Sequence, residues 1–114
     1  MTQGLKTIIY PVRDLEKAKA LYGSLLGVEP EMDEAYYVGF DAGGQHLGLN
    51  PHGHDHGMTT AVPYWHVPDI EAALAALTGA GAAARQPVTD VGGGRLTATV
   101  VDLDGNVIGL LQDP

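Results

Sequence analysis

Histidines carry the most evident chemical potential in this chain of 114 residues, which has five of them. His52, His54 and His56 alternate in a short segment that also holds Asp55. If the segment is extended, alternate side chains share a face, and three imidazoles could converge on a divalent metal ion. The neighbouring glycines instead favour a flexible linker, whose ordering costs about 1–2 kcal/mol per residue. We therefore expect only adventitious binding of a divalent metal at these histidines.

His66 ends a stretch rich in strand-forming residues, in which Val62 and Tyr64 would share its face. An imidazole there could act as a general base or donate a hydrogen bond to a ligand carbonyl. The alternative is a histidine at a strand end that bonds to its own loop. Trp65 would point to the opposite side and is expected in the core, so its truncation to alanine would cost about 3–5 kcal/mol.

Two amphipathic helices must position these side chains, and each begins after an aspartate suited to cap it. Asp14 precedes apolar residues at helical spacing, and Gly27 is suited to end that helix. Asp69 precedes a second such pattern, which Gly79 and Gly81 are expected to end. The remaining pattern predicts strands over 5–12, 28–32, 36–40, 45–50, 61–67, 82–88, 95–101 and 107–112, and a linker over 51–60.

The two halves of the chain repeat one another. Val12-x-Asp14-Leu15 recurs as Val67-x-Asp69-Ile70, and the two aspartates are 55 positions apart (69 − 14 = 55). Each half also closes on an apolar run centred on a glycine, at Gly48 and Gly109. A repeat of half the chain length predicts two similar βαβββ modules, 5–50 and 61–112, within one domain spanning 1–114.

Composition excludes several classes of function. The chain has 6 basic and 14 acidic residues and a net charge of −8, which argues against nucleic acid and anionic membranes as partners. It has no cysteine, so disulfides and thiolate metal sites are excluded. No apolar run approaches the roughly 20 residues that span a bilayer, and the first residues do not resemble a signal peptide. We therefore expect a cytoplasmic protein.

Four motifs, in this order and spacing, resemble the vicinal oxygen chelate superfamily of glyoxalase I, bleomycin-resistance proteins, extradiol dioxygenases and fosfomycin-resistance enzymes. The resemblance covers about residues 7–112. It implies an α+β fold in which two βαβββ modules form a curved, cup-shaped mixed sheet, and it implies a homodimer. The motifs are those at 12–15 and 67–70, Tyr22-x-x-Leu25-Leu26-Gly27, and Asp102-x-Asp104-Gly105-Asn106-x-Ile108.

The same resemblance locates the metal ligands that some members use. It places them at Thr7 and Val62 on the first strand of each module, and at Gly48 and Gly109 on the last. None of these four residues can hold a divalent metal through its side chain as His, Asp or Glu would. We therefore expect no metal cofactor at these positions.

Strand parity, counted from those positions, predicts which residues line a cleft between the modules. One of Tyr36 and Tyr37 could also reach it, because neighbours on a strand face opposite ways. The function expected is metal-free binding of a small molecule, as in bleomycin-resistance proteins. Two alternatives stay open: an enzyme of lyase or dioxygenase type, with His66 as base or an atypical metal set such as His46 and His66, and a non-catalytic module. The predicted ligand-binding residues are Thr7, Ile9, His46, Asn50, Tyr64, His66 and Leu111.

Overall fold

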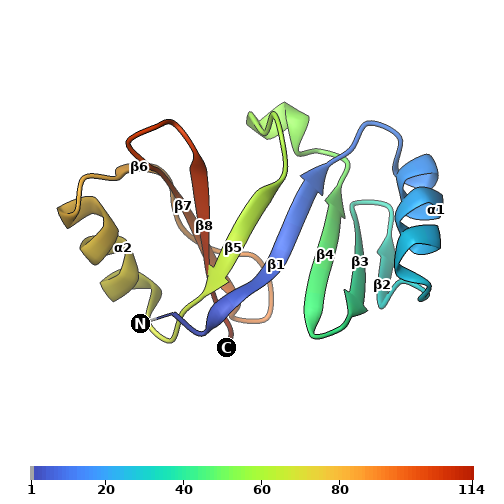
Figure 1. The fold of residues 1–114 in the computed structure, drawn as a ribbon, viewed down its shortest axis with the longest axis horizontal. Helices are drawn as coiled ribbons and strands as arrows, with labels where there is room; N and C mark the ends of the chain where they lie inside the picture. Colours follow the sequence, from blue (N-terminus) through green and yellow to red (C-terminus); the bar gives the residue numbers. More distant parts are fainter. Residues whose placement is uncertain (1) are drawn as a thin grey trace. The chain divides into compact units, whose positions relative to one another are not determined.

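The computed structural model describes residues 2–114, which form two compact units. We call residues 6–62 the N-terminal unit, and residues 2–5 with 63–114 the C-terminal unit. The elements follow the order βαβββ twice along the chain, as the sequence repeat predicts (Figure 1). The α+β fold with two βαβββ modules is therefore confirmed.

The N-terminal unit has a mixed sheet of four strands in the order β2-β3-β4-β1. Strand β1 runs parallel to β4, whereas β2, β3 and β4 are antiparallel neighbours. Its elements are β1 (Gly4–Pro11), α1 (Leu15–Leu26), β2 (Met32–Glu34), β3 (Tyr37–Ala42) and β4 (Gln45–Asn50), followed by a short 3₁₀ helix, η1 (His54–His56).

The C-terminal unit repeats this topology, with strands in the order β5-β8-β7-β6. Strand β5 runs parallel to β8, and β6, β7 and β8 are antiparallel neighbours. Among residues 2–114, no helix is long and apolar enough to cross a membrane. The elements of this unit are β5 (Val62–His66), α2 (Ile70–Gly79), β6 (Ala83–Asp90), β7 (Leu96–Val101) and β8 (Val107–Gln112).

Both helices begin where the aspartates predict. The carboxylate of Asp14 accepts a hydrogen bond from the backbone N–H of Lys17 at 3.0 Å, and Asp69 does the same for Ala72 at 3.1 Å. These bonds satisfy amides that the first helical turn leaves without a partner. Gly27 ends α1 in the left-handed conformation, with φ of 71°, which glycine adopts without steric cost.

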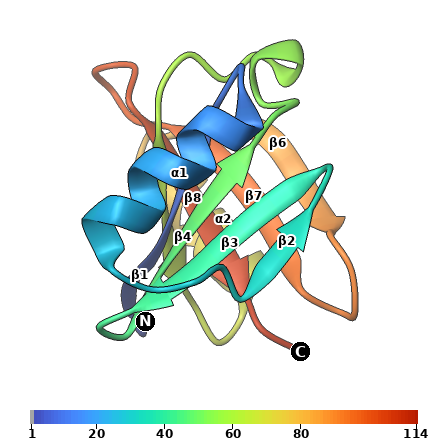
Figure 2. The ribbon, with the colours of Figure 1, turned by 90° about the vertical axis from the view of Figure 1, so that its right-hand side faces the viewer.

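Each helix packs on one face of the sheet of its own unit. Helix α1 lies across β3 and β4 (Figure 2), where Val38, Phe40 and Leu49 are buried beneath it. In the C-terminal unit, α2 covers a second core that contains Ala98 and Leu110. Because strand side chains alternate, the other face of each sheet carries a different set of residues.

One strand differs clearly from the expectation. The predicted strand over 28–32 is absent, and β2 begins only at Met32. Pro30 has no N–H to donate to a sheet, so pairing starts after it, first through the N–H of Glu31 to the carbonyl of Gly39 at 2.8 Å. The other strand ends agree with the prediction to within two residues, and β4 and β8 match it at both ends.

Candidate functional site

In the N-terminal unit, several predicted ligand-binding residues share the sheet face opposite α1. Thr7 pairs with His46, and Ile9 pairs with Gly48, across the parallel strands β1 and β4. The residues between them on β4 pack toward α1, so this group faces away from the helix. Thr7 is fully buried and His46 is half-buried.

His46 is held between two side chains of the neighbouring strand β3. Its Nδ1 lies 2.6 Å from Oδ1 of Asp41, and its Nε2 lies 2.8 Å from the hydroxyl of Tyr37. The rings of Tyr37 and His46 are nearly parallel, with an interplanar angle of 12° and centroids 6.1 Å apart. The face opposite α1 therefore presents a carboxylate, an imidazole and a phenol in a hydrogen-bonded row.

In the C-terminal unit, three more predicted residues share the face opposite α2. Tyr64 pairs with Gly109 and His66 pairs with Leu111, whereas Leu110 between them packs into the core beneath α2. Tyr64, His66 and Leu111 are all buried. Burial raises the pKa of the Tyr64 hydroxyl above its usual value.

A tyrosine ring lies over the central glycine of the last strand in each unit. A Cβ at Gly48 would be 2.6 Å from Cζ of Tyr37, and a Cβ at Gly109 would be 2.5 Å from Cδ1 of Tyr64. Both distances are far inside van der Waals contact, so neither position accepts a side chain without moving a ring. Both units therefore have a tyrosine ring packed against the central glycine of the last strand.

His66 is oriented by Asp113, which also pairs with Arg95. Its Nδ1 is 3.3 Å from Oδ2 of Asp113, and Oδ1 of Asp113 accepts from Nη2 of Arg95 at 2.8 Å. Its backbone carbonyl accepts from the N–H of Gln3 at 2.6 Å. The side chain therefore pairs with the residue just after β8 rather than with its own loop.

The prediction that Trp65 is a core residue is wrong, although its facing is right. Trp65 pairs with Leu110 and so lies on the helix side of the sheet, but it is 37% exposed. Helix α2 packs on β6, β7 and β8 and does not cover β5. Truncation of Trp65 should therefore cost much less than the 3–5 kcal/mol of a buried aromatic.

The histidine-rich segment does not form an extended strand. His54 and His56 lie in η1, and Nδ1 of His54 is buried without a hydrogen-bond partner. Within residues 2–114, no group of three or more His, Asp or Glu side chains is placed to hold a metal ion. The side chain of Asn50 turns toward this segment and accepts from the N–H of His52 at 2.9 Å.

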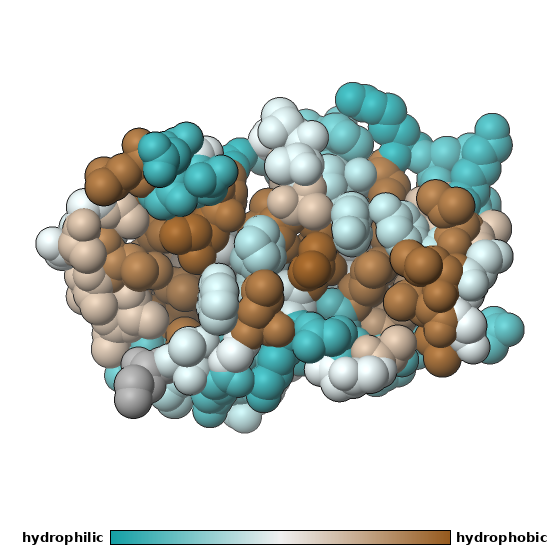
Figure 3. All heavy atoms as spheres, in the orientation of Figure 1, coloured by the Kyte–Doolittle hydropathy of each residue, from teal (hydrophilic) through white to brown (hydrophobic). Residues whose placement is uncertain are grey.

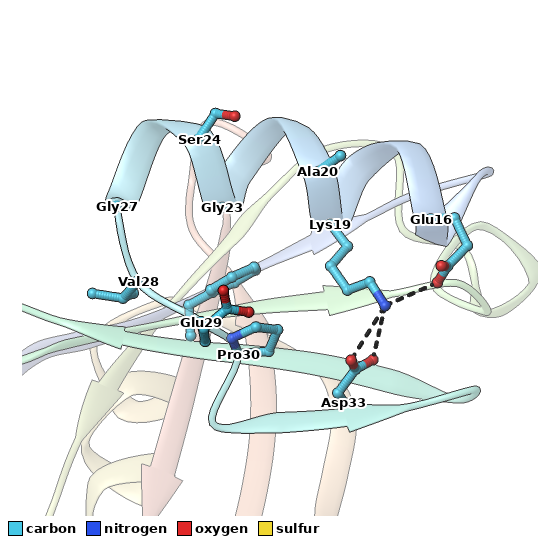
Figure 4. Close-up of a pocket in the computed structure, with 11 residues that line it drawn as sticks. Glu16, Lys19, Ala20, Gly23, Ser24, Gly27, Val28, Glu29, Pro30 and Asp33 are labelled. Carbon is cyan, nitrogen blue, oxygen red and sulfur yellow. Dashed lines mark hydrogen bonds and ion pairs between the residues drawn. The ribbon is translucent and has the colours of Figure 1, made fainter.

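A separate open pocket of about 580 Å³ lies beside α1, between that helix and the segment that leads into β2 (Figure 4). Lys19 reaches across it to Glu16 and Asp33, each at 3.2 Å. These hydrogen bonds, which Lys19 donates, raise its pKa, and the bond to Glu16 has the larger effect. Lys19 is therefore paired with two carboxylates of this pocket, and none of the predicted ligand-binding residues lines it.

Comparison with known proteins identifies the family. The sequence profile of the Glyoxalase/Bleomycin resistance protein/Dioxygenase superfamily matches residues 4–110. The chain belongs to this superfamily. No curated protein matches it.

Solved structures share the fold of this superfamily member at low sequence identity. A glyoxalase/bleomycin resistance protein/dioxygenase superfamily member from Vibrio splendidus is 15% identical, with a TM-score of 0.71 over 94% of this chain and 97% of that one. An NAD-dependent benzaldehyde dehydrogenase from Legionella pneumophila is 17% identical, with a TM-score of 0.77 over 95% and 98%. A methylmalonyl-CoA epimerase from Mycobacterium tuberculosis is 16% identical, with a TM-score of 0.70 over 99% and 89%.

The residues at the superfamily's metal-ligand positions do not fit a metal ion. Gly48 and Gly109 have no side-chain donor atom, and a tyrosine ring covers each of them. Val62 is apolar, which leaves only the hydroxyl of Thr7 among the four. A catalytic divalent metal takes about three His, Asp or Glu ligands.

Sequence reasoning missed the partners of both histidines. The predicted strands over 36–40 and 45–50 leave Asp41 between them, and Asp113 follows the last predicted strand. For Asp41 a signal exists, because a tight turn at Gly43 and Gly44 sets position 41 opposite position 46. For Asp113 the sequence offers no comparable signal.

Proposed function

We propose that this superfamily member binds a small organic molecule without a catalytic metal, using the sheet faces opposite its helices. The observation that carries the proposal is the pair of tyrosines over Gly48 and Gly109. Where a metal-using relative would present a carboxylate, each unit presents an aromatic ring. This follows the bleomycin-resistance branch that the sequence resembles.

The side chains on these faces favour a ligand with a planar ring and polar groups. Tyr37 and His46 present nearly parallel rings, and aromatic rings contact planar ligands well. In the C-terminal unit, Tyr64 and His66 present groups that donate and accept hydrogen bonds. Ring stacking with one or two hydrogen bonds therefore describes the recognition that we propose.

The test is a thermal-shift screen of planar small molecules and divalent metals on chelator-washed protein. A ligand that binds only the folded state, at 100 times its Kd, should add about 2.7 kcal/mol to the free energy of unfolding. In calorimetric titrations, Tyr37→Phe should weaken binding to the N-terminal unit and His66→Ala should weaken binding to the C-terminal unit, whereas the exposed Leu103→Ala should weaken neither. One tightly held metal per chain in elemental analysis, required for ligand binding, would contradict the proposal.

A second candidate, a metal-free lyase-type enzyme with His66 as base, is favoured by the contact of His66 with Asp113. A carboxylate on Nδ1 leaves Nε2 as the proton acceptor, which is the arrangement of a general base. Product formation from a bound ligand, lost in His66→Gln with little change in KM, would establish it. Ligand binding without product formation would exclude the enzyme and support the metal-free binding function.

A further inference from the structure

The hydrogen-bonded row on β3 and β4 has a defined proton direction. An ionised carboxylate can only accept, so Nδ1 of His46 donates to Asp41. When His46 is neutral, its other nitrogen, Nε2, is an acceptor and can receive the hydroxyl proton of Tyr37 at 2.8 Å. A hydroxyl whose proton is accepted by an imidazole, itself oriented by a carboxylate, is the arrangement that activates a nucleophile.

Two glycines make room for this row. Gly39 and Gly48 are direct partners on β3 and β4. Neither has a left-handed φ, so the backbone itself does not require glycine at either position. A Cβ at Gly39 would lie 2.7 Å from Cε1 of His46, and one at Gly48 would displace the ring of Tyr37. Glycine weakens a strand, so a facing pair is best explained by the two rings that lie on it.

The row is partly exposed to solvent. The side chain of His46 is 23% exposed and that of Asp41 is 53% exposed. Tyr37 is half-buried, so part of its side chain reaches the surface. The β3–β4 hairpin is joined by five paired positions along its backbone. This partial exposure of the row is typical of reactive side chains and differs from the full burial typical of side chains that only stabilise the fold.

We propose that Asp41, His46 and Tyr37 form a nucleophilic relay in which the Tyr37 hydroxyl attacks small esters. The Tyr37 oxygen bonds to the ester carbonyl carbon while its proton passes to Nε2 of His46. The bond from that carbon to the leaving oxygen then breaks, and the leaving oxygen takes the proton from Nε2. The products are acylated Tyr37 and a free alcohol. Asp41 is a positioning residue that stabilises the transient imidazolium.

This inference goes beyond the proposed binding function and is tested with p-nitrophenyl acetate as the probe. Mixing should release a burst approaching one equivalent of p-nitrophenol, with the acetyl group on Tyr37 in mass spectrometry. His46→Gln should slow the burst by about 100-fold, as expected for loss of a general base. Tyr37→Phe should abolish it. The controls are Tyr36→Phe and Gln45→Ala, which change exposed neighbours on the same hairpin and should leave the burst unchanged.

Other labelling patterns would overturn the relay. One is acetylation found only on His46 or only on lysines. Another is acetylation of Tyr36 and Tyr37 at equal rates. A third is a burst of p-nitrophenol that survives in folded His46→Gln. The acetylation test uses p-nitrophenyl acetate and needs no natural ligand. Its outcome is therefore independent of the thermal-shift screen that tests the proposed binding function. Thermal melting of each variant establishes that it is folded.

A spectroscopic measurement on the unaltered protein tests the relay without any substitution. The ¹⁵N shifts of His46 at neutral pH should show a protonated Nδ1 and an unprotonated Nε2. Asp41→Asn should change this tautomer and slow acetylation, which a purely structural role of Asp41 would not do. Gly48→Ala should displace Tyr37 and abolish the burst, whereas Gly79→Ala, with open space around its Cβ, should not. A protonated Nε2 in the unaltered protein would overturn the proposal.

Discussion

At the level of single residues, the tyrosines over Gly48 and Gly109 link packing to function. Each ring fills the space beside a strand where the superfamily's metal-using members present a ligand. The arrangement accounts for two glycines in the middle of strands, where glycine is otherwise unfavourable. It also means that our proposal of metal-free binding rests on local geometry as well as on residue type.

The contact between Tyr64 and Gly109 can be measured with a double-mutant cycle. Gly109→Ala should cost about 1–3 kcal/mol, because its Cβ would overlap the Tyr64 ring. In the Tyr64→Ala background the same change should cost much less, because the overlap is gone. Urea unfolding gives both values, with Gly79→Ala as the control. Equal costs in the two backgrounds would show that the ring does not occupy this space.

Burial of Tyr64 predicts a loss of stability at alkaline pH. Its pKa is raised in the folded state by burial, whereas the unfolded chain titrates near the ordinary value of 10.0. Below pH 10, Tyr64 makes its full contribution to the free energy of unfolding. This contribution is lost as the pH rises through the folded-state pKa, because Tyr64 ionises first in the unfolded chain. Urea unfolding between pH 8 and 11 should show a smaller decline for Tyr64→Phe. The exposed Tyr36→Phe should decline as the unaltered protein does.

At the level of elements, the helix caps give the strongest agreement between sequence and structure. Asp14→Ala and Asp69→Ala should each lower the free energy of unfolding by about 1 kcal/mol, because each leaves an amide of the first turn without its acceptor. Asp104→Ala removes the same charge in an exposed turn and serves as the control. If all three variants melt alike, the caps contribute nothing beyond charge.

The elements also show why part of the site could be predicted and part could not. Alternation along a strand is local, so the sequence correctly places Thr7 and His46 on one face and Tyr64 and His66 on another. The contact of His66 with Asp113 depends on side-chain directions between distant segments, which no local pattern encodes. The exposure of Trp65 depends on which strands α2 covers, and that is a property of the assembled unit.

At the level of the whole molecule, the surface of α1 predicts association. Leu21 and Leu25 lie one helical turn apart and are 66% and 74% exposed. Apolar atoms gather over this part of the molecule (Figure 3), and the large exposed residues Val28, Met32 and Tyr36 follow in sequence. Such a patch on a small domain is typical of an interaction surface.

We therefore expect a homodimer that covers this patch. Light scattering coupled to size-exclusion chromatography should give twice the chain mass of 11.9 kDa at micromolar concentration. Leu25→Lys should shift the protein toward the monomer. The control is Leu103→Lys, which adds the same charge at a more exposed leucine of the C-terminal unit and should leave the dimer intact. A monomer in the unaltered protein would exclude this assembly.

The sequence repeat and the compact units do not divide the chain at the same places, because residues 2–5 belong with 63–114. Cutting the chain in the linker therefore yields no complete unit: the C-terminal fragment loses the Gln3 amide that bonds the His66 carbonyl. A circular permutant avoids this. If a short peptide joins Pro114 to Thr2 and the new chain starts at Pro63, the C-terminal unit becomes continuous in sequence. Dissecting this protein into halves thus requires a new chain order, not a shorter chain.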